Sequence, residues 1–342
     1  MPEVSPHLDA VLVIGPNWIG DAVMSTPALA NLRRGLPKAE IDLLVPRSVG
    51  SLFEGHPHVD RVLIRDDRQA WPARLTQVLA LRQRRYGAAV LLPNSFRSAL
   101  YAWLVGAPIR VGHATDGRRW LLTHPVSAVK AGEPRHQVGA YLRLVGALGL
   151  PVVDRLPRLA ATVKAEMTAE RLWRARGLGR GAPVIGICPG AAFGPAKRWW
   201  PERFAALADR LIADGGWRVV FFGSAQESTL VERIRASMAH EAVSLAGQDA
   251  LDSFVALATR CAVMIANDSG AMHIASAAGT PVVALFGPTD PRRTAPMSAH
   301  ATVLRRDLPC SPCFRPTCPY ADHPCMRLIG VDEVYRAVCG YL

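Results

Sequence analysis

The sequence predicts an α/β protein of two domains, each with a parallel sheet flanked by helices. The chain has 342 residues, which suggests two domains rather than one. Half of its residues are hydrophobic, so each domain can bury a sizeable core. Short apolar runs alternate with helical patterns along the chain, and parallel strands need such crossovers.

The elements of the first half follow this alternation. AVLVIG (10–15) predicts a strand, and a helix is expected from about 20 to 35. Three apolar runs predict further strands, a short strand is expected at RVGH, and two segments predict helices. The strands are EIDLLVP (40–46), RVLIR (61–65), AAVLLP (88–93) and RVGH (110–113), and the helices are 71–85 and 95–106.

Residues 151–165 carry prolines and show weak periodicity, so the boundary is predicted there, with domains 1–160 and 161–342. A second alternating series follows. PERFAALADRLIADGG (201–216) is a well-marked helix, because Pro201 suits a first turn and Gly215 an end. Other strands are expected at 183–190, 217–224, 242–247, 262–268 and 281–287, with helices between them. The result is two Rossmann-like halves, and a cleft between such halves is the usual ligand site.

Charge points to an anionic partner for the first half. The net charge is +12, of which residues 1–160 hold +8 and residues 161–342 hold +4. An alternative is an arginine bias unrelated to binding, because the chain has 36 Arg and 4 Lys. No stretch interleaves aromatic and basic residues as single-strand binders do, so no nucleic-acid partner is expected, whereas a membrane surface fits. The chain start lacks a signal-peptide pattern, and we expect a cytoplasmic protein.

The stretch GPNWIGD (15–21) follows the first strand but makes a poor phosphate loop. It lacks the G-x-G-x-x-G pattern, Pro16 removes a backbone donor, and Asp21 adds negative charge at a helix start. The helix N-terminus favours an ionised carboxylate. Asp21 is therefore either a general base that takes a proton from a hydroxyl or a helix cap.

Two stretches of the second half favour an anion site. CPGAAFGPAKRWWP (188–201) has small residues that allow close backbone approach, and Lys197 is one of the four lysines. The alternative for this stretch is an ordinary βα loop. In NDSGAMH (267–273), the amides of Ser269, Gly270 and Ala271 begin a helix and can receive a diphosphate. His273 adds a donor unless it is a buried structural histidine, and Asp268 suits sugar hydroxyls. A carboxylate in one domain and a diphosphate site in the other suit group transfer from a nucleotide-linked donor.

These motifs resemble glycosyltransferase family 9, the ADP-heptose:lipopolysaccharide heptosyltransferases. GPNWIGDAVMSTPAL, LLPNSFRSAL, CPGAAFGPAKRWWP and NDSGAMHIASAAGTPVVALFGPT occur in the family's order over about residues 10–330, most like the type II members. The resemblance implies a GT-B fold, a cytoplasmic enzyme at the inner membrane, and inverting transfer of heptose from ADP-heptose to heptose I of the inner core on Kdo–lipid A. It also implies that no cofactor is required.

The resemblance also implies residue roles. Asp21 matches the general base, and the first domain would bind the acceptor and the second the nucleotide sugar. Donor binding is expected of Lys197, Glu227, Asp268, Ser269, Gly270 and His273, and acceptor binding of Arg97, Arg47, Arg135 and Arg143. Alternatives are transfer by a type I or other family 9 enzyme, or an inactive relative that only binds an ADP-sugar. An epimerase or dehydrogenase would need the absent G-x-G-x-x-G.

A cysteine-rich stretch near the end stands apart from the transfer chemistry. Cys310, Cys313, Cys318 and Cys325 have the spacing C-x2-C-x4-C-x6-C, close enough for a metal site or for disulfides. A cytosolic setting disfavours disulfides, and zinc sites often use two C-x2-C pairs where this chain has one. A structural metal and free or partly oxidised thiols both remain open.

Overall fold

The computed structural model describes residues 8–342 except 67, 69, 128–135, 180 and 249. Two compact units make up the chain, Met1–Pro157 and Arg158–Leu342, where the sequence predicts a division after residue 160. Each unit holds one six-stranded sheet. The α/β class predicted from the sequence is confirmed.

In the first unit all strand pairs are parallel. The order across the sheet is β3 (Arg61–Arg65), β2 (Glu40–Pro46), β1 (Ala10–Ile14), β4 (Ala88–Leu91), β5 (Ile109–His113) and β6 (His124–Val126). This is the Rossmann order. Only β6 was not expected from the sequence, because three partly exposed residues give almost no pattern.

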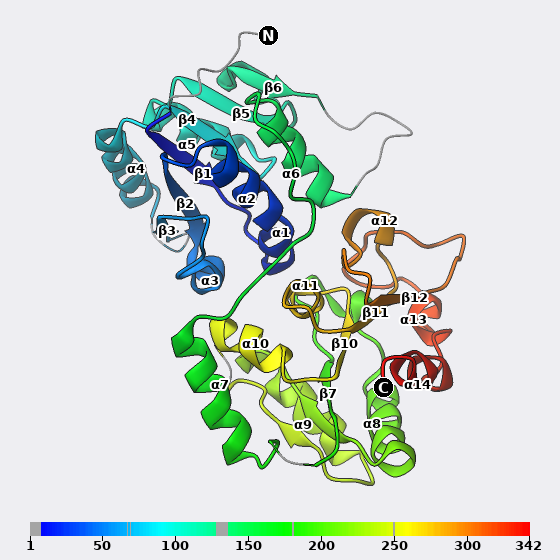
Figure 1. Cartoon of the computed structure of the whole chain (residues 1–342). Helices are drawn as coiled ribbons and strands as arrows, with labels where there is room; N and C mark the ends of the chain where they lie inside the picture. Colours follow the sequence, from blue (N-terminus) through cyan, green and yellow to red (C-terminus); the bar gives the residue numbers. More distant parts are fainter. Residues whose placement is uncertain (1–7, 67, 69, 128–135, 180, 249) are drawn as a thin grey trace. The chain divides into compact units, whose positions relative to one another are not determined.

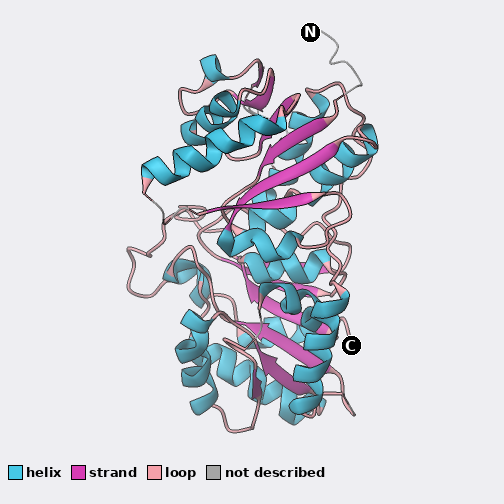
Figure 2. Cartoon of the chain, turned by 90° about the vertical axis from the view of Figure 1, so that its left-hand side faces the viewer, coloured by secondary structure: helices cyan, strands magenta, loops and turns pink. Residues whose placement is uncertain are grey.

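Helices cover both faces of this sheet (Figures 1 and 2). Helix α2 packs with α6, and α4 packs with α5. The helices are α1 (Ile19–Met24), α2 (Thr26–Gly35), α3 (Arg47–Gly50), α4 (Trp71–Ala80), α5 (Phe96–Val105) and α6 (Gln137–Gly146), with 3₁₀ turns at Ser51–Phe53, Leu81–Arg84 and Arg119–Leu121. The single helix expected over 20–35 is two helices, because Ser25 ends α1 and Pro27 begins the next turn without an N–H.

The second unit repeats the same order. From edge to edge its parallel strands are β12 (Ala301–Arg305), β11 (Val282–Phe286), β10 (Val263–Asn267), β7 (Val184–Cys188), β8 (Arg218–Phe221) and β9 (Val243–Ser244). Its helices are α7 (Val163–Ala175), α8 (Pro201–Gly215), α9 (Ser228–Ala236), α10 (Leu251–Ala258), α11 (Gly270–Ala277), α12 (Pro291–Thr294), α13 (Pro324–Arg327) and α14 (Val331–Cys339), with 3₁₀ turns at Pro195–Lys197 and Ala225–Glu227. Edge strand β12 was missed by the sequence prediction.

Each sheet has a buried apolar core. In the second unit Ile187, Phe204 and Phe221 are fully buried beside the Trp199 ring, which meets Phe204 edge to face with centroids 5.0 Å apart. Burial of such side chains contributes about 2 kcal/mol each. These cores make both sheets rigid, and each sheet supports the loops that follow the carboxyl ends of its strands.

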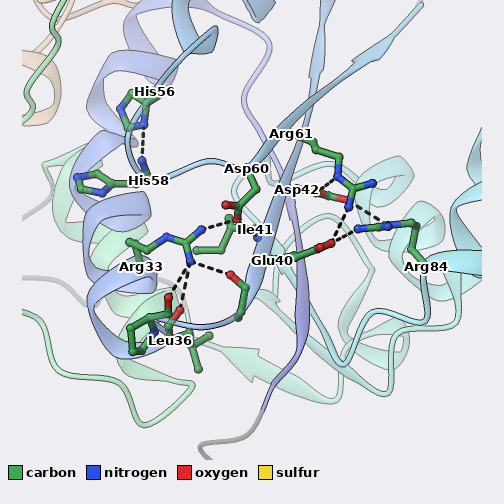
Figure 3. A network of polar contacts seen from close by, with 12 residues as sticks. Arg33, Leu36, Glu40, Ile41, Asp42, His56, His58, Asp60, Arg61 and Arg84 are labelled. Atoms are coloured by element: carbon green, nitrogen blue, oxygen red, sulfur yellow. Dashed lines mark hydrogen bonds and ion pairs between the residues drawn. The ribbon is translucent and has the colours of Figure 1, made fainter.

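A polar network occupies the opposite, amino end of β2 (Figure 3). Asp42 is fully buried and accepts a hydrogen bond of 2.6 Å from the Tyr86 hydroxyl, while Arg61 and Arg84 lie beside it. Glu40 pairs with the same two arginines. The network ties β2 to β3 and to the turn before β4. Buried Asp42 therefore has a structural role.

Candidate functional site

In the second unit the sheet order reverses between β7 and β10, and ligands bind doubly wound sheets beyond the carboxyl ends of such strands. Asn267, the last residue of β10, is fully buried and ties the two loops there together. Its Oδ1 accepts from the Trp199 amide at 3.0 Å, and its Nδ2 donates to the Pro189 carbonyl at 2.8 Å. The amide thereby fixes the ends of the loop that carries Lys197.

Lys197 and Asp268 meet at this point. The lysine Nζ lies 2.6 Å from Asp268 Oδ2, with side chains 14% and 4% exposed. Thr289, after β11, donates to the same oxygen at 2.6 Å. The Lys197 ammonium also lies 4.9 Å from the centre of the Phe193 ring. An ammonium has three donors, so Asp268 fixes Lys197 and leaves N–H groups for a further anion.

Helix α11 begins beside this pair. Its N-cap residue Ser269 makes no capping hydrogen bond, and within the described residues its buried Oγ has no partner. The first amides of a helix lack partners inside it, and Gly270 lets a ligand approach them. His273 lies in the first turn and is 5% exposed. The arrangement offers backbone, hydroxyl and ammonium donors to an anion.

Glu227 lies against the loop that follows β7. Its Oε2 accepts from the Ser224 amide and hydroxyl, both at 2.9 Å. Its Oε1 faces Gly190 so closely that a Cβ at position 190 would lie 1.8 Å away. A side chain at position 190 would therefore displace the Glu227 carboxylate from its present place. Lys197, Glu227, Asp268, Ser269, Gly270 and His273 thus all belong to loops or helix starts at the carboxyl edge of one sheet.

In the first unit Asp21 is the third residue of α1, and the N-cap position belongs to Trp18. The Tyr141 hydroxyl, from α6, forms a hydrogen bond with Asp21, and Tyr141 is 2% exposed. Burial, and next the charge of Asp21, raise the pKa of Tyr141 well above its usual value. The phenol therefore stays protonated and donates to the carboxylate.

The order of this sheet reverses between β1 and β4, and Arg97 lies there. Arg97 shares a small pocket with Asn17, Arg65 and Tyr101. The Arg65 Nη2 donates to Asn17 Oδ1 at 2.6 Å. The loop after β1 and the start of α5 are therefore brought together, and both Asp21 and Arg97 lie at the carboxyl edge of the sheet.

The other predicted acceptor arginines are less well grouped. Arg47 is exposed at the start of α3, and the Nη2 of Arg143 donates to the Ser127 carbonyl at 3.2 Å. Neither lines the pocket of Arg97. Arg135 lies outside the described residues.

Comparison with known proteins shows to which family the chain belongs. Residues 74–323 match the sequence profile of the family described as glycosyltransferase family 9 (heptosyltransferase). The chain belongs to glycosyltransferase family 9. It is a family 9 heptosyltransferase, an enzyme of the class that transfers glycosyl groups.

Several relatives of this family 9 enzyme are known. Lipopolysaccharide heptosyltransferase 2 of Escherichia coli K12 is 36% identical over 306 residues, covering 86% of this chain and 87% of the relative. Lipopolysaccharide heptosyltransferase 1 of Pseudomonas aeruginosa is 28% identical over 329 residues, covering 91% and 87%. The solved structure of E. coli ADP-heptose lps heptosyltransferase II has a TM-score of 0.83 at 34% identity, covering 97% and 98%. The predicted GT-B architecture is confirmed.

Sequence reasoning missed Arg118, which organises the start of α5 in this family 9 enzyme. Arg118 is fully buried, and its Nη1 donates to the carbonyls of Pro93 (2.6 Å) and Ser95 (3.0 Å) and to the Ser98 hydroxyl (2.7 Å). Burial lowers its pKa to about 10, so it remains a cation at neutral pH. In DGRR (116–119) nothing distinguishes a buried arginine from a surface one, and only the packing does.

The cysteines of the family 9 chain are free thiols. Cys325 is buried, and burial followed by the proximity of Cys318, Cys310 and Cys313 raises its pKa to about 11. Among the described residues no three or more His, Cys, Asp or Glu are arranged to hold a metal ion. The metal interpretation of Cys310, Cys313, Cys318 and Cys325 therefore finds no support in this structure.

A groove of about 620 Å³ lies elsewhere in the second unit, beside Arg218 and Val243. None of the site residues predicted from the sequence lines it. Arg218 is the first residue of β8. The groove is therefore at the amino end of that strand, and we place the candidate site at the carboxyl edge.

Proposed function

We propose that this enzyme transfers L-glycero-D-manno-heptose from ADP-heptose to heptose I of the lipopolysaccharide inner core, with inversion. The convergence of Lys197, Asp268 and the start of α11 carries the proposal, because it joins a cation and a helix start without a side-chain cap at one sheet edge. The names of the type 2 relative and of the type II structure support the donor and the acceptor. The type 1 relative is less similar, which favours heptose I as the acceptor.

The second unit would hold the donor. Lys197, His273 and the amides of Ser269 and Gly270 would bind the diphosphate, which is stabilised as it gathers charge. Glu227, whose Oε2 is occupied by Ser224, would accept from a ribose hydroxyl through Oε1. Asp268 would act through Lys197, since its Oδ2 already receives two donors.

Asp21 would act as the general base. Its carboxylate takes the proton of the acceptor hydroxyl, whose oxygen attacks the anomeric carbon from the face opposite the diphosphate. The new carbon–oxygen bond forms as the bond to the diphosphate breaks, and ADP leaves with the electron pair. The Tyr141 hydroxyl would orient Asp21 for this step.

The test is turnover of ADP-heptose with a heptose I acceptor, followed by linkage analysis of the product. Asp21→Asn should lose at least a hundredfold in kcat and keep its affinity for ADP. Asp252→Asn removes another first-turn carboxylate, on α10, and should leave both unchanged. Turnover by Asp21→Asn at the wild-type rate would remove the base role, and a product linked to Kdo would indicate type I transfer.

The acceptor would be reached at a membrane, with the first unit as the contacting part. Residues 71–127 hold eight arginines, of which Arg118 is buried, and one acidic residue, Asp116. In the same stretch of the chain, Phe96, Trp103 and Trp120 are 38%, 52% and 71% exposed. Basic surfaces bind anionic lipids, and tryptophan favours the headgroup region. The described residues include no helix that is long and apolar enough to cross a membrane.

Vesicle sedimentation tests this contact. The wild type should bind vesicles of phosphatidylglycerol and phosphatidylcholine and release them at high salt. Replacing Trp103 and Trp120 with alanine should weaken binding about tenfold, whereas Met167→Ala, at a 69% exposed apolar residue of the second unit, should not. Equal binding by all three proteins would contradict this surface.

A further inference from the structure

The stretch from Cys310 to Met326, here called the Cys-rich segment, packs on the loop that carries Lys197. The Ala196 amide donates to the Pro316 carbonyl at 3.0 Å. The His323 Nε2 lies 2.8 Å from the Ala196 carbonyl, and since a carbonyl only accepts, Nε2 carries the proton. Both backbone groups of Ala196 are thus held by the segment.

The same segment also forms hydrogen bonds with a second loop, which follows β11. The amides of Cys313 and Phe314 donate to the Pro288 carbonyl at 3.0 and 2.8 Å. The Ser311 hydroxyl donates to the Gly287 carbonyl at 2.7 Å. Buried Met326 also lies against Gly287, where a Cβ would come within 2.5 Å of its sulfur.

Two of the residues that the segment holds directly precede a side chain that contacts Asp268. Ala196 precedes Lys197, and Pro288 precedes Thr289. Lys197 and Thr289 reach the same oxygen of Asp268, each at 2.6 Å. The segment therefore joins, on its own surface, the two loops whose side chains converge on one carboxylate of the candidate donor site.

The backbone is specialised for this contact. Phe314 and His323 have φ of 56° and 42°, a left-handed conformation that non-glycine residues adopt at a cost of about 1 kcal/mol. Gly194 has φ 153°, and a Cβ there would lie 2.4 Å from the Pro316 carbonyl oxygen. Strain of this kind persists where the surroundings hold it, and it clusters at functional sites.

We propose that the Cys-rich segment sets the position of Lys197 and Thr289, with His323 as the positioning residue for the nucleotide-sugar site. This inference rests on the proposed function, because it assumes that Lys197 binds the donor. It assigns the segment a role through backbone and imidazole contacts, without any metal at the thiols.

The test compares His323→Phe, which removes the donor and keeps a ring, with His323→Gln, which keeps an N–H donor. Loss of one hydrogen bond that positions Lys197 should raise the KM for ADP-heptose and the Kd for ADP about fivefold in the Phe variant. The kcat and the acceptor KM should stay within twofold. His323→Gln should lie closer to the wild type.

Gly194→Ala tests the same contact from the other side and should also raise the donor KM. If His323→Phe does not fold, the donor constants of Gly194→Ala and His323→Gln still test the inference. Donor constants equal to the wild type in the variants that fold would overturn the inference, as would a loss of kcat alone. Failure of the proposed function differs, because then the wild type itself would not bind ADP, or Lys197→Ala would bind it normally.

Discussion

Removal of the Lys197 ammonium is expected to cost both stability and nucleotide binding, and a second substitution separates the two. Lys197→Met leaves Asp268, 4% exposed, without its cation. Removing one partner of a buried ion pair costs about 3–5 kcal/mol. The lower value, about 3 kcal/mol, applies here because Lys197 is 14% exposed and Thr289 still donates to the carboxylate.

The double variant Lys197→Met/Asp268→Asn contains no unpaired buried charge. It should therefore regain about 2 kcal/mol of the unfolding free energy relative to Lys197→Met. Its affinity for ADP should remain about 30-fold below the wild type, because the charge-assisted bonds to phosphate are still missing.

Urea denaturation followed by circular dichroism measures the stability, and isothermal titration with ADP measures the binding. Lys164→Met, at an exposed lysine of α7, is the matched control and should change stability by less than about 0.5 kcal/mol. The reasoning fails if the double variant is no more stable than Lys197→Met, or if it binds ADP like the wild type.

Three further outcomes are expected. Tyr141→Phe removes the donor to Asp21 and should lower kcat about tenfold with unchanged ADP affinity, so wild-type initial rates would count against the pairing. Arg118→Met removes the charge-assisted hydrogen bonds that the buried guanidinium donates to the carbonyls of Pro93 and Ser95 and to the Ser98 hydroxyl, and it should lower the unfolding free energy by about 3 kcal/mol in urea. Burial, then His58, lowers the pKa of His56 from 6.5 to about 4. Between pH 6.5 and about 4, the His56 side chain therefore carries a proton in the unfolded chain but not in the folded protein. Stability contributed by neutral His56, about 3 kcal/mol, is complete above pH 6.5 and lost as the pH falls toward 4. In His56→Gln the unfolding free energy should depend less on pH over this window, and an unchanged pH dependence would contradict the assignment.

Most of the fold could be predicted from the sequence because its signals are local. Buried parallel strands such as β7 and β10 are continuous apolar runs, and helix α8 has both a proline start and a glycine end. The signals fail where local pattern is weak. Strands β6 and β12 are partly exposed edge strands, and the break at Ser25 depends on a single proline in an otherwise helical stretch.

By itself, the sequence determined which residues are chemically suited to a donor site, because Lys197, Asp268 and the helix start after Ser269 lie in short motifs after apolar runs. Only the tertiary structure decided which of them touch. Lys197 meets Asp268 across 71 residues, and His323 reaches Ala196 across 127. The donor of Asp21, Tyr141, comes from a different helix. Such pairs depend on strand order and on the crossovers that bring distant strand ends to one edge, and no local pattern carries that information.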